Sequence, residues 1–184
     1  MKLSTILCLS LGSANVHGAT VKISNADEFI AFSNNVNNKA TYAGTTVLLT
    51  NDITFTAAQS KKFVPVGNSF VAMFRGTFDG QWYTLNNLAL NSSSARVGVF
   101  GFSGGSDVRN LVVGASCAVT STYTQGATET ITGGVFGACD ASSGSCNIEN
   151  NVNLARVSFQ GEAMTSSVYA AGIVGKCTQG SYVC

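Results

Sequence analysis

Three copies of a short glycine-bounded motif constrain the fold of this chain more than any other feature. In each copy two apolar residues stand between two glycines, and consecutive copies start 36 and 38 residues apart. The copies are "VGVFG" at 97–101, "GGVFG" at 133–137 and "AGIVG" at 171–175. A repeat of this length is one supersecondary unit, and it must stack on its neighbours to bury its apolar face.

A second repeated element places an aliphatic residue two positions before an asparagine. We expect three such pairs to be equivalent: Leu85 and Asn87 in "TLNNL", Val108 and Asn110 in "VRNLVV", and Ile148 and Asn150 in "IENNV". Asparagine tolerates the left-handed backbone of a sharp corner, and stacked asparagines can bond to one another through their amides. We therefore predict structural corners at Asn87, Asn110 and Asn150. The alternative is that asparagine is simply a common loop residue.

Short β-branched runs lie between these corners and indicate β-strands of four to eight residues. The runs are "TTVLL", "DITF", "YTLNNLAL", "ITGGVF" and "ARVSF". Short strands, glycine corners and a stacking repeat favour an all-β fold in which parallel strands coil. An antiparallel sandwich also uses short strands, but it does not require the same asparagine and glycine at a fixed offset.

One segment near the N-terminus, "SNADEFIAFSNNVNN" at 24–38, predicts an amphipathic helix. Ser24 or Asn25 can cap it, and Asp27 and Glu28 suit its positive first turn. We expect this helix to cover the open N-terminal end of the coil, where unpaired strand edges would recruit other chains. The predicted organisation is an N-terminal strand and capping helix at 20–44, followed by the coiled β-domain at 45–184.

The first residues predict a signal peptide at 1–19. "MKLSTILCLSLGSANVHGA" has Lys2, an apolar stretch and then small residues, although a first β-strand is the alternative. The protein is then secreted, without membrane insertion, because no apolar run is long enough to span a bilayer. Only 10% of residues are charged and the net charge is +1, which argues against nucleic acid as a partner. The one histidine, His17, falls in the signal segment.

Five cysteines remain after the signal segment. "GACDASSGSC" and "GKCTQGSYVC" each place two of them seven positions apart. We predict disulfides Cys139–Cys146 and Cys177–Cys184, with Cys117 left unpaired, because export permits disulfides. Four cysteines on one zinc ion is the competing hypothesis, although the gap is wider than in common zinc sites.

A single carboxylate, Asp79, stands at a Gly-flanked corner in "GTFDGQWYTLNNLAL". It is either a catalytic acid or the corner residue of a turn. Acid–base cleavage of a polysaccharide needs converging carboxylates, and Asp79, Asp107 and Asp140 share no repeat position. Because Asp before Gly80 is typical of a tight turn, we predict that Asp79 and Gly80 are structural.

Three further residues are candidates for surface roles. Trp82 and Tyr83 either stack on a sugar or complete the core. Asn91 begins the only N-glycosylation sequon, "NSS", which matters only in a eukaryotic secretory pathway.

The chain resembles the GLUG-motif repeat proteins. The resemblance covers nearly the whole mature chain and includes the helix segment, the three glycine-bounded units, "TTVLLTNDITF" (45–55), "FVPVG" (63–67) and "FRGTFDGQWYTLNNLAL" (74–90). It implies a right-handed parallel β-helix, the architecture of pectin lyases, in secreted or cell-surface proteins that include adhesin-like ones. It supplies no catalytic residues, and the paired cysteines depart from the family pattern.

The resulting functional hypothesis is a non-catalytic secreted or surface-displayed module that acts as an adhesin or scaffold. It predicts no cofactor and no metal, and cell-surface glycans or proteins as partners. The alternatives are a carbohydrate-active enzyme of pectin-lyase architecture and the non-catalytic N-terminal part of a larger secreted peptidase. Because the third repeat stops at Cys184, we also expect further coils, or a partner that docks on the C-terminal end.

Overall fold

The computed structural model describes residues 18–122, 129–140, 144–160 and 167–178 of the chain. Nearly all of the predicted signal peptide lies outside these residues, and so does Cys184 with its predicted disulfide. The described residues form two α-helices and eighteen β-strands, so the fold is mostly β.

The strands form five sheets, which we number by the order in which the chain enters them. The first sheet contains, in spatial order, β1 (Thr20–Ile23), β2 (Thr46–Leu49), β4 (Thr77–Asp79), β9 (Asp107–Arg109) and β14 (Asn147–Glu149). The second contains β3 (Ile53–Thr54), β5 (Thr84–Asn86), β10 (Val112–Val113) and β15 (Val152–Asn153). The third contains β6 (Ala89–Ser92), β11 (Ala118–Ser121) and β16 (Arg156–Phe159). The fourth contains β7 (Arg96–Val97), β12 (Glu129–Gly133) and β17 (Ser167–Ala171), and the fifth β8 (Phe100–Ser103), β13 (Phe136–Asp140) and β18 (Val174–Thr178).

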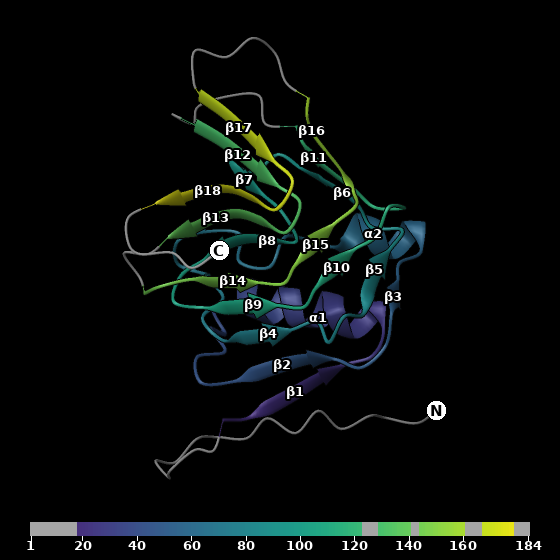
Figure 1. The fold of residues 1–184 in the computed structure, drawn as a ribbon, viewed down its shortest axis with the longest axis vertical. Coiled ribbons are helices and arrows are strands. Elements are labelled where there is room, and N and C mark those ends of the chain that lie inside the picture. The colour runs from purple at the N-terminus through teal and green to yellow at the C-terminus, as the bar shows by residue number, and fades with distance from the viewer. Residues whose placement is uncertain (1–17, 123–128, 141–143, 161–166, 179–184) are drawn as a thin grey trace.

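All strand pairs within these sheets are parallel. The antiparallel sandwich considered from the sequence is therefore wrong for the described strands. From β4 onward consecutive strands belong to different sheets: β4 to β8 visit the five sheets in turn, and β9 to β13 and β14 to β18 repeat the order. We call these three groups of five strands the first, second and third rungs; Figure 1 shows the strands of the first sheet stacked from β1 to β14.

The glycine-bounded motifs stack in register, as predicted. Phe100 of the first motif pairs with Phe136 of the second, which pairs with Val174 of the third. The two phenylalanine rings stack with 5.2 Å between their centroids. The repeat is thus the segment that fills the core of successive rungs.

The predicted equivalence of Asn87 with Asn110 and Asn150 is wrong. Val108 pairs with Ile148 and with Phe78, whereas Leu85 pairs with Val113 and Ile53 in the second sheet. The physical reason is that a rung has more than one sharp corner, and each favours an asparagine after an apolar strand. The same local pattern therefore marks two different corners.

All three asparagines nevertheless form corners. Asn87, Asn110 and Asn150 have left-handed backbones, with φ of 58°, 54° and 54°. Only Asn110 and Asn150 stack, and the Asn150 amide nitrogen lies 3.5 Å from the Asn110 side-chain oxygen. The predicted asparagine ladder thus has two members.

Two runs predicted as single strands are each broken by a corner. Residues 83–90 give β5 and β6, which are separated at Asn87, and residues 131–136 end β12 and begin β13 around Gly133 and Gly134. A Cβ on Gly134 would lie 2.2 Å from the Gly172 carbonyl oxygen, so adjacent rungs meet backbone to backbone there.

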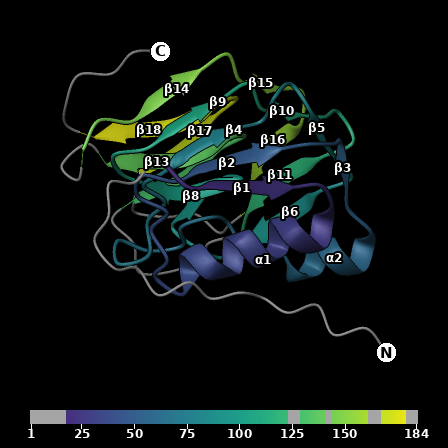
Figure 2. The ribbon, with the colours of Figure 1, turned by 90° about the horizontal axis from the view of Figure 1, so that it is seen from below.

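The predicted N-terminal helix is present as α1 (Ala26–Asn37), which begins at its N-cap Asn25. The Asn25 side chain accepts a hydrogen bond from the Glu28 backbone nitrogen, and the Ser24 nitrogen donates to the Glu28 carboxylate. Phe29 and Phe32 of α1 are buried and contact Phe78 of β4 through their rings. A second helix, α2 (Ala57–Lys62), lies beside α1, and both cover one side of the strands (Figure 2).

Candidate functional site

Among the described residues, the corner that follows β4 has two consecutive non-glycine residues with left-handed backbones. Gln81 and Trp82 both have left-handed backbones, with φ of 51° and 62°. For a non-glycine residue this conformation costs about 1 kcal/mol or more, and such strain is concentrated at functional sites. Gly80 precedes them because a Cβ there would lie 2.5 Å from the Asn110 carbonyl oxygen. The corner is held on the next rung by the bond from the Trp82 nitrogen to that carbonyl, at 2.8 Å.

Asp79 uses both carboxylate oxygens inside this corner. Its Oδ1 accepts from the Gln81 backbone nitrogen and from Asn110 Nδ2, each at 3.0 Å. Its Oδ2 pairs with Arg109 Nε at 3.0 Å. The side chain of Asp79 is 7% exposed, whereas that of Arg109 is 43% exposed. Asp79 therefore lies under the corner and links it to the second rung.

The electrostatic surroundings keep Asp79 ionised. Burial by itself raises the pKa of the carboxyl, but the hydrogen bonds from Asn110, Gln81 and Arg109 together outweigh it and hold the pKa below its ordinary value. A general acid needs the opposite shift, toward the working pH. This shift suits the structural role predicted for Asp79 better than the role of a general acid.

The outward face of the first sheet carries a polar array that the sequence analysis missed. Asp79 pairs in register with Arg109, which pairs with Glu149. In the neighbouring column Thr77 pairs with Asp107, and the Thr77 hydroxyl donates to the Asp107 carboxylate at 3.3 Å. From the sequence, only the repeat positions of Asp79, Asp107 and Asp140 were compared, and Glu149 was therefore overlooked. The signal that would have found it is the alternation in "TFD", "DVR" and "NIE", where the central residue is apolar in each.

Trp82 and Tyr83 lie in different environments. Tyr83 is half-buried and packs against the core. Trp82 is 57% exposed, although it is the only tryptophan of the chain. A strained corner thus displays a large aromatic side chain beside Asn110, which can form contacts with a sugar or a protein.

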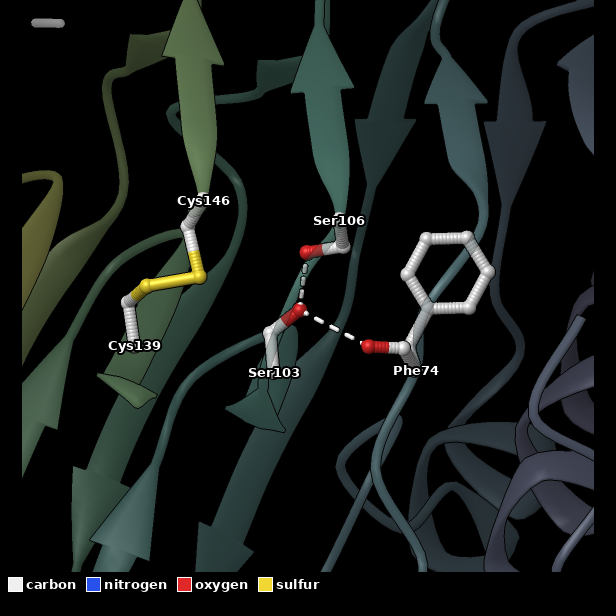
Figure 3. The surroundings of a disulfide bond; sticks show 5 residues. All are labelled: Phe74, Ser103, Ser106, Cys139 and Cys146. Atoms are coloured by element: carbon white, nitrogen blue, oxygen red, sulfur yellow. Dashed lines mark hydrogen bonds between the residues drawn. A yellow bond between two sulfur atoms is a disulfide. The ribbon is translucent and has the colours of Figure 1, made fainter. Parts of the chain in front are cut away.

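The predicted disulfide Cys139–Cys146 is confirmed, with 6.3 Å between the two Cα atoms. It closes the corner between β13 and β14, so these two thiols are not available to the zinc site considered as the alternative. In the preceding rung the hydroxyls of Ser103 and Ser106 hydrogen-bond to each other at this corner, and Ser103 also donates to the Phe74 carbonyl (Figure 3). Cys177 pairs in register with Cys139, while its predicted partner Cys184 lies outside the described residues.

Cys117 is buried and forms no disulfide with another described residue. Its thiol donates to the Leu85 carbonyl at 3.1 Å and accepts from the Leu88 nitrogen at 3.4 Å. Burial raises the pKa of this thiol, which favours its protonated form. Asn91, the predicted glycosylation site, is exposed on β6.

The described residues contain no group of three or more His, Cys, Asp or Glu side chains that could hold a metal ion, and no helix long and apolar enough to cross a membrane. The chain matches no protein-family model, no curated protein and no solved structure.

Proposed function

We propose that the chain is a secreted or cell-surface module of the GLUG-motif type, folded as a right-handed parallel β-helix and binding its partner without catalysis. The β-helix is supported by the all-parallel pairing and by the repeated order of the five sheets. The Cys139–Cys146 disulfide supports export, because such bonds persist in oxidising compartments.

One observation carries the proposed binding role. At the corner after β4 the carboxylate is fully engaged in structural bonds, while the tryptophan two residues beyond Gly80 remains exposed on a strained backbone. The corner thus offers an aromatic contact surface but not a free acid. Cell-surface glycans are the favoured partners, because an exposed indole beside amide and guanidinium groups can stack on a sugar ring and bond to its hydroxyls.

The test is binding of the purified chain to a panel of immobilised microbial and plant polysaccharides. We expect Trp82→Ala to weaken binding roughly twofold to tenfold, the value of one aromatic contact. Tyr83→Phe is the matched control, since it keeps the neighbouring half-buried ring and should bind like the wild type. Equal binding by wild type and Trp82→Ala would contradict the role of this corner.

The carbohydrate-active enzyme is the second candidate, and the column of Asp79, Arg109 and Glu149 is the observation that favours it. Glycoside hydrolysis uses a pair of carboxylates that flank the scissile bond, and this column contains two carboxylates. Release of soluble fragments from the same polysaccharides distinguishes the two candidates. Release that is abolished by Glu149→Gln in a folded protein would establish the enzyme.

We make two additional proposals. One is that a docking partner or further coils cover the third rung, and the other is that the chain is part of a larger secreted peptidase. A hollow at the third rung supports the proposal that a partner or further coils cover it. It measures about 450 Å³ and is lined by Ile148, Ile173 and Val174 among others. The full-length reading frame tests both proposals.

A further inference from the structure

A groove between α2 and β6 is formed by residues other than those of the Trp82 corner. Its volume is about 590 Å³, within the range of about 300–1,000 Å³ typical of ligand sites. The buried ring of Phe55 lines it together with Ala57 and Lys61 of the helix and Ala89 and Asn91 of the strand. Nothing in the proposed function uses this groove.

The strand side of the groove is the edge of a sheet. Among the described strands, β6 is the outer strand of the third sheet and pairs only with β11. The carbonyls of Leu88 and Ser92 accept from the nitrogens of Ala118 and Thr122, on the β11 side. Because backbone groups alternate along a strand, those of Ala89 and Asn91 point away from β11, toward the groove.

Helix α2 satisfies only part of this edge. The Ala89 nitrogen donates to Ser60 Oγ at 2.7 Å, and Ser60 Oγ donates to the Asn87 carbonyl at 3.3 Å. Ser60 thus replaces a neighbouring strand over this short stretch. The Ala89 carbonyl and the Asn91 N–H have no hydrogen-bond partner among the described residues. One acceptor and one donor remain, with the spacing of a β-ladder.

The helix side of the groove is positively charged. Lys61 lines it, and no acidic residue does. The ion pairs within the described residues involve Arg96, Arg109 and Lys176, so Lys61 has no acidic partner there. A ligand with negative charge at this position would neutralise it.

From this juxtaposition we infer that the groove binds an extended acidic peptide segment, which adds to β6 as a further strand. The peptide backbone donates to the Ala89 carbonyl and accepts from the Asn91 N–H, and an acidic side chain pairs with Lys61. Addition of a strand to an open edge is a common mode of peptide recognition, in which main-chain bonds supply affinity and side chains supply specificity.

The test uses the full chain made in bacteria, so that Asn91 carries no glycan, and a capped peptide of alternating glutamate and valine. The control peptide has the same sequence with every amide N-methylated, which removes its backbone donors. We expect the first peptide to bind and the second not to. We also expect hydrogen exchange at the Asn91 amide to slow on binding, while the Ala89 amide, which Ser60 already engages, stays unchanged.

Two charge reversals test the role of Lys61. Lys61→Glu should weaken peptide binding about fivefold, the factor that corresponds to about 1 kcal/mol for an exposed pair. Lys62→Glu, the matched control, has the same change of charge one residue away but does not line the groove, and it should bind nearly as the wild type does.

Three results would overturn the inference. The N-methylated peptide binds as well as its parent, or both lysine variants lose affinity equally, or hydrogen exchange at the Asn91 amide does not slow when the peptide is added. Binding of oligogalacturonate with dependence on Lys61, in the absence of peptide binding, would instead make the groove a saccharide site.

Discussion

At the scale of single residues, the corner after β4 shows how one side chain can be structural while its neighbour is displayed. Asp79 bonds to the Gln81 backbone, to Asn110 and to Arg109, and thereby fixes the corner to the second rung. That fixation holds the left-handed backbone of Trp82, whose ring faces solvent. The strain is therefore offset by bonds that a free turn would lack.

The first prediction concerns Asp79→Asn. The variant keeps an oxygen that can accept from Gln81 but loses the charge opposite Arg109, so we expect the free energy of unfolding at pH 7 to fall by about 1–2 kcal/mol. Urea unfolding of both proteins measures the difference. Asp107→Asn, on the same sheet face, is the control and should lose less, because the Asn oxygen still accepts from Thr77.

The free energies of unfolding of wild type and Asp79→Asn should also depend differently on pH. The folded-state pKa of Asp79 lies below its unfolded value, so its stabilisation is fully present above about pH 4 and is lost as the pH falls through the folded pKa. The difference in free energy of unfolding between wild type and Asp79→Asn should therefore become smaller in acid. A gap that stays constant down to pH 2 would show that ionisation of Asp79 does not stabilise the fold.

At the scale of elements, the corner between the fifth and first sheets is closed by a different chemistry in successive rungs. Ser103 and Ser106 close it with a hydrogen bond in the first rung, and Cys139 and Cys146 close the next one with a disulfide. The register of β8 with β13 places Ser103 next to Cys139 (Figure 3). The disulfide thus links covalently the corner that a hydrogen bond closes in the preceding rung.

The second prediction is that replacing both Cys139 and Cys146 by serine lowers the free energy of unfolding by about 2.5 kcal/mol, from the chain entropy of so short a loop. Chemical denaturation measures the loss. A reductant should destabilise the wild type by about this amount more than it destabilises the double variant, in which only the predicted Cys177–Cys184 bond is left to reduce. If the reductant destabilised both proteins equally, the Cys139–Cys146 bond would not be the source of the effect.

At the scale of the whole molecule, the rungs differ in how much they contact neighbouring strands and helices. Rings of α1 fill the interior beside the first rung, and the second rung is paired on both sides. Among the described strands, each strand of the third rung is the outer strand of its sheet, and Val168 and Tyr169 of β17 are exposed. In a stacked array each unit is stabilised mainly by its neighbours, so the third rung has the weakest support.

The third prediction is a gradient of hydrogen exchange along the stack. In the chain as printed, we expect amides of β17 and β18 to exchange roughly tenfold or more faster than those of β12 and β13, because local opening needs less energy there. Exchange mass spectrometry, with light scattering to record the association state, measures it. Equal protection of both pairs in a monomer would contradict the gradient.

Much of this arrangement could be predicted from the sequence, because it rests on local chemistry. The helix at 24–38 follows from its cap and apolar spacing, and the Cys139–Cys146 bond follows from a short loop within one repeat. Register between sheets could not be predicted in the same way. Leu85 and Asn87 carry the same pattern as Val108 and Asn110, yet they belong to different corners, since a strand's sheet depends on how many corners precede it.

The sequence by itself determined that the chain would form short strands and sharp corners that repeat with a stacking period. The reason is that the backbone preferences of glycine and asparagine, and the alternation of apolar residues, act over only a few positions. Only the tertiary structure decided which side chains meet. Glu149 joins the column of Asp79 and Arg109, and Ser60 occupies the edge of β6, through contacts between residues 27 or more positions apart. Such contacts depend on the accumulated register of whole rungs, which no local pattern encodes.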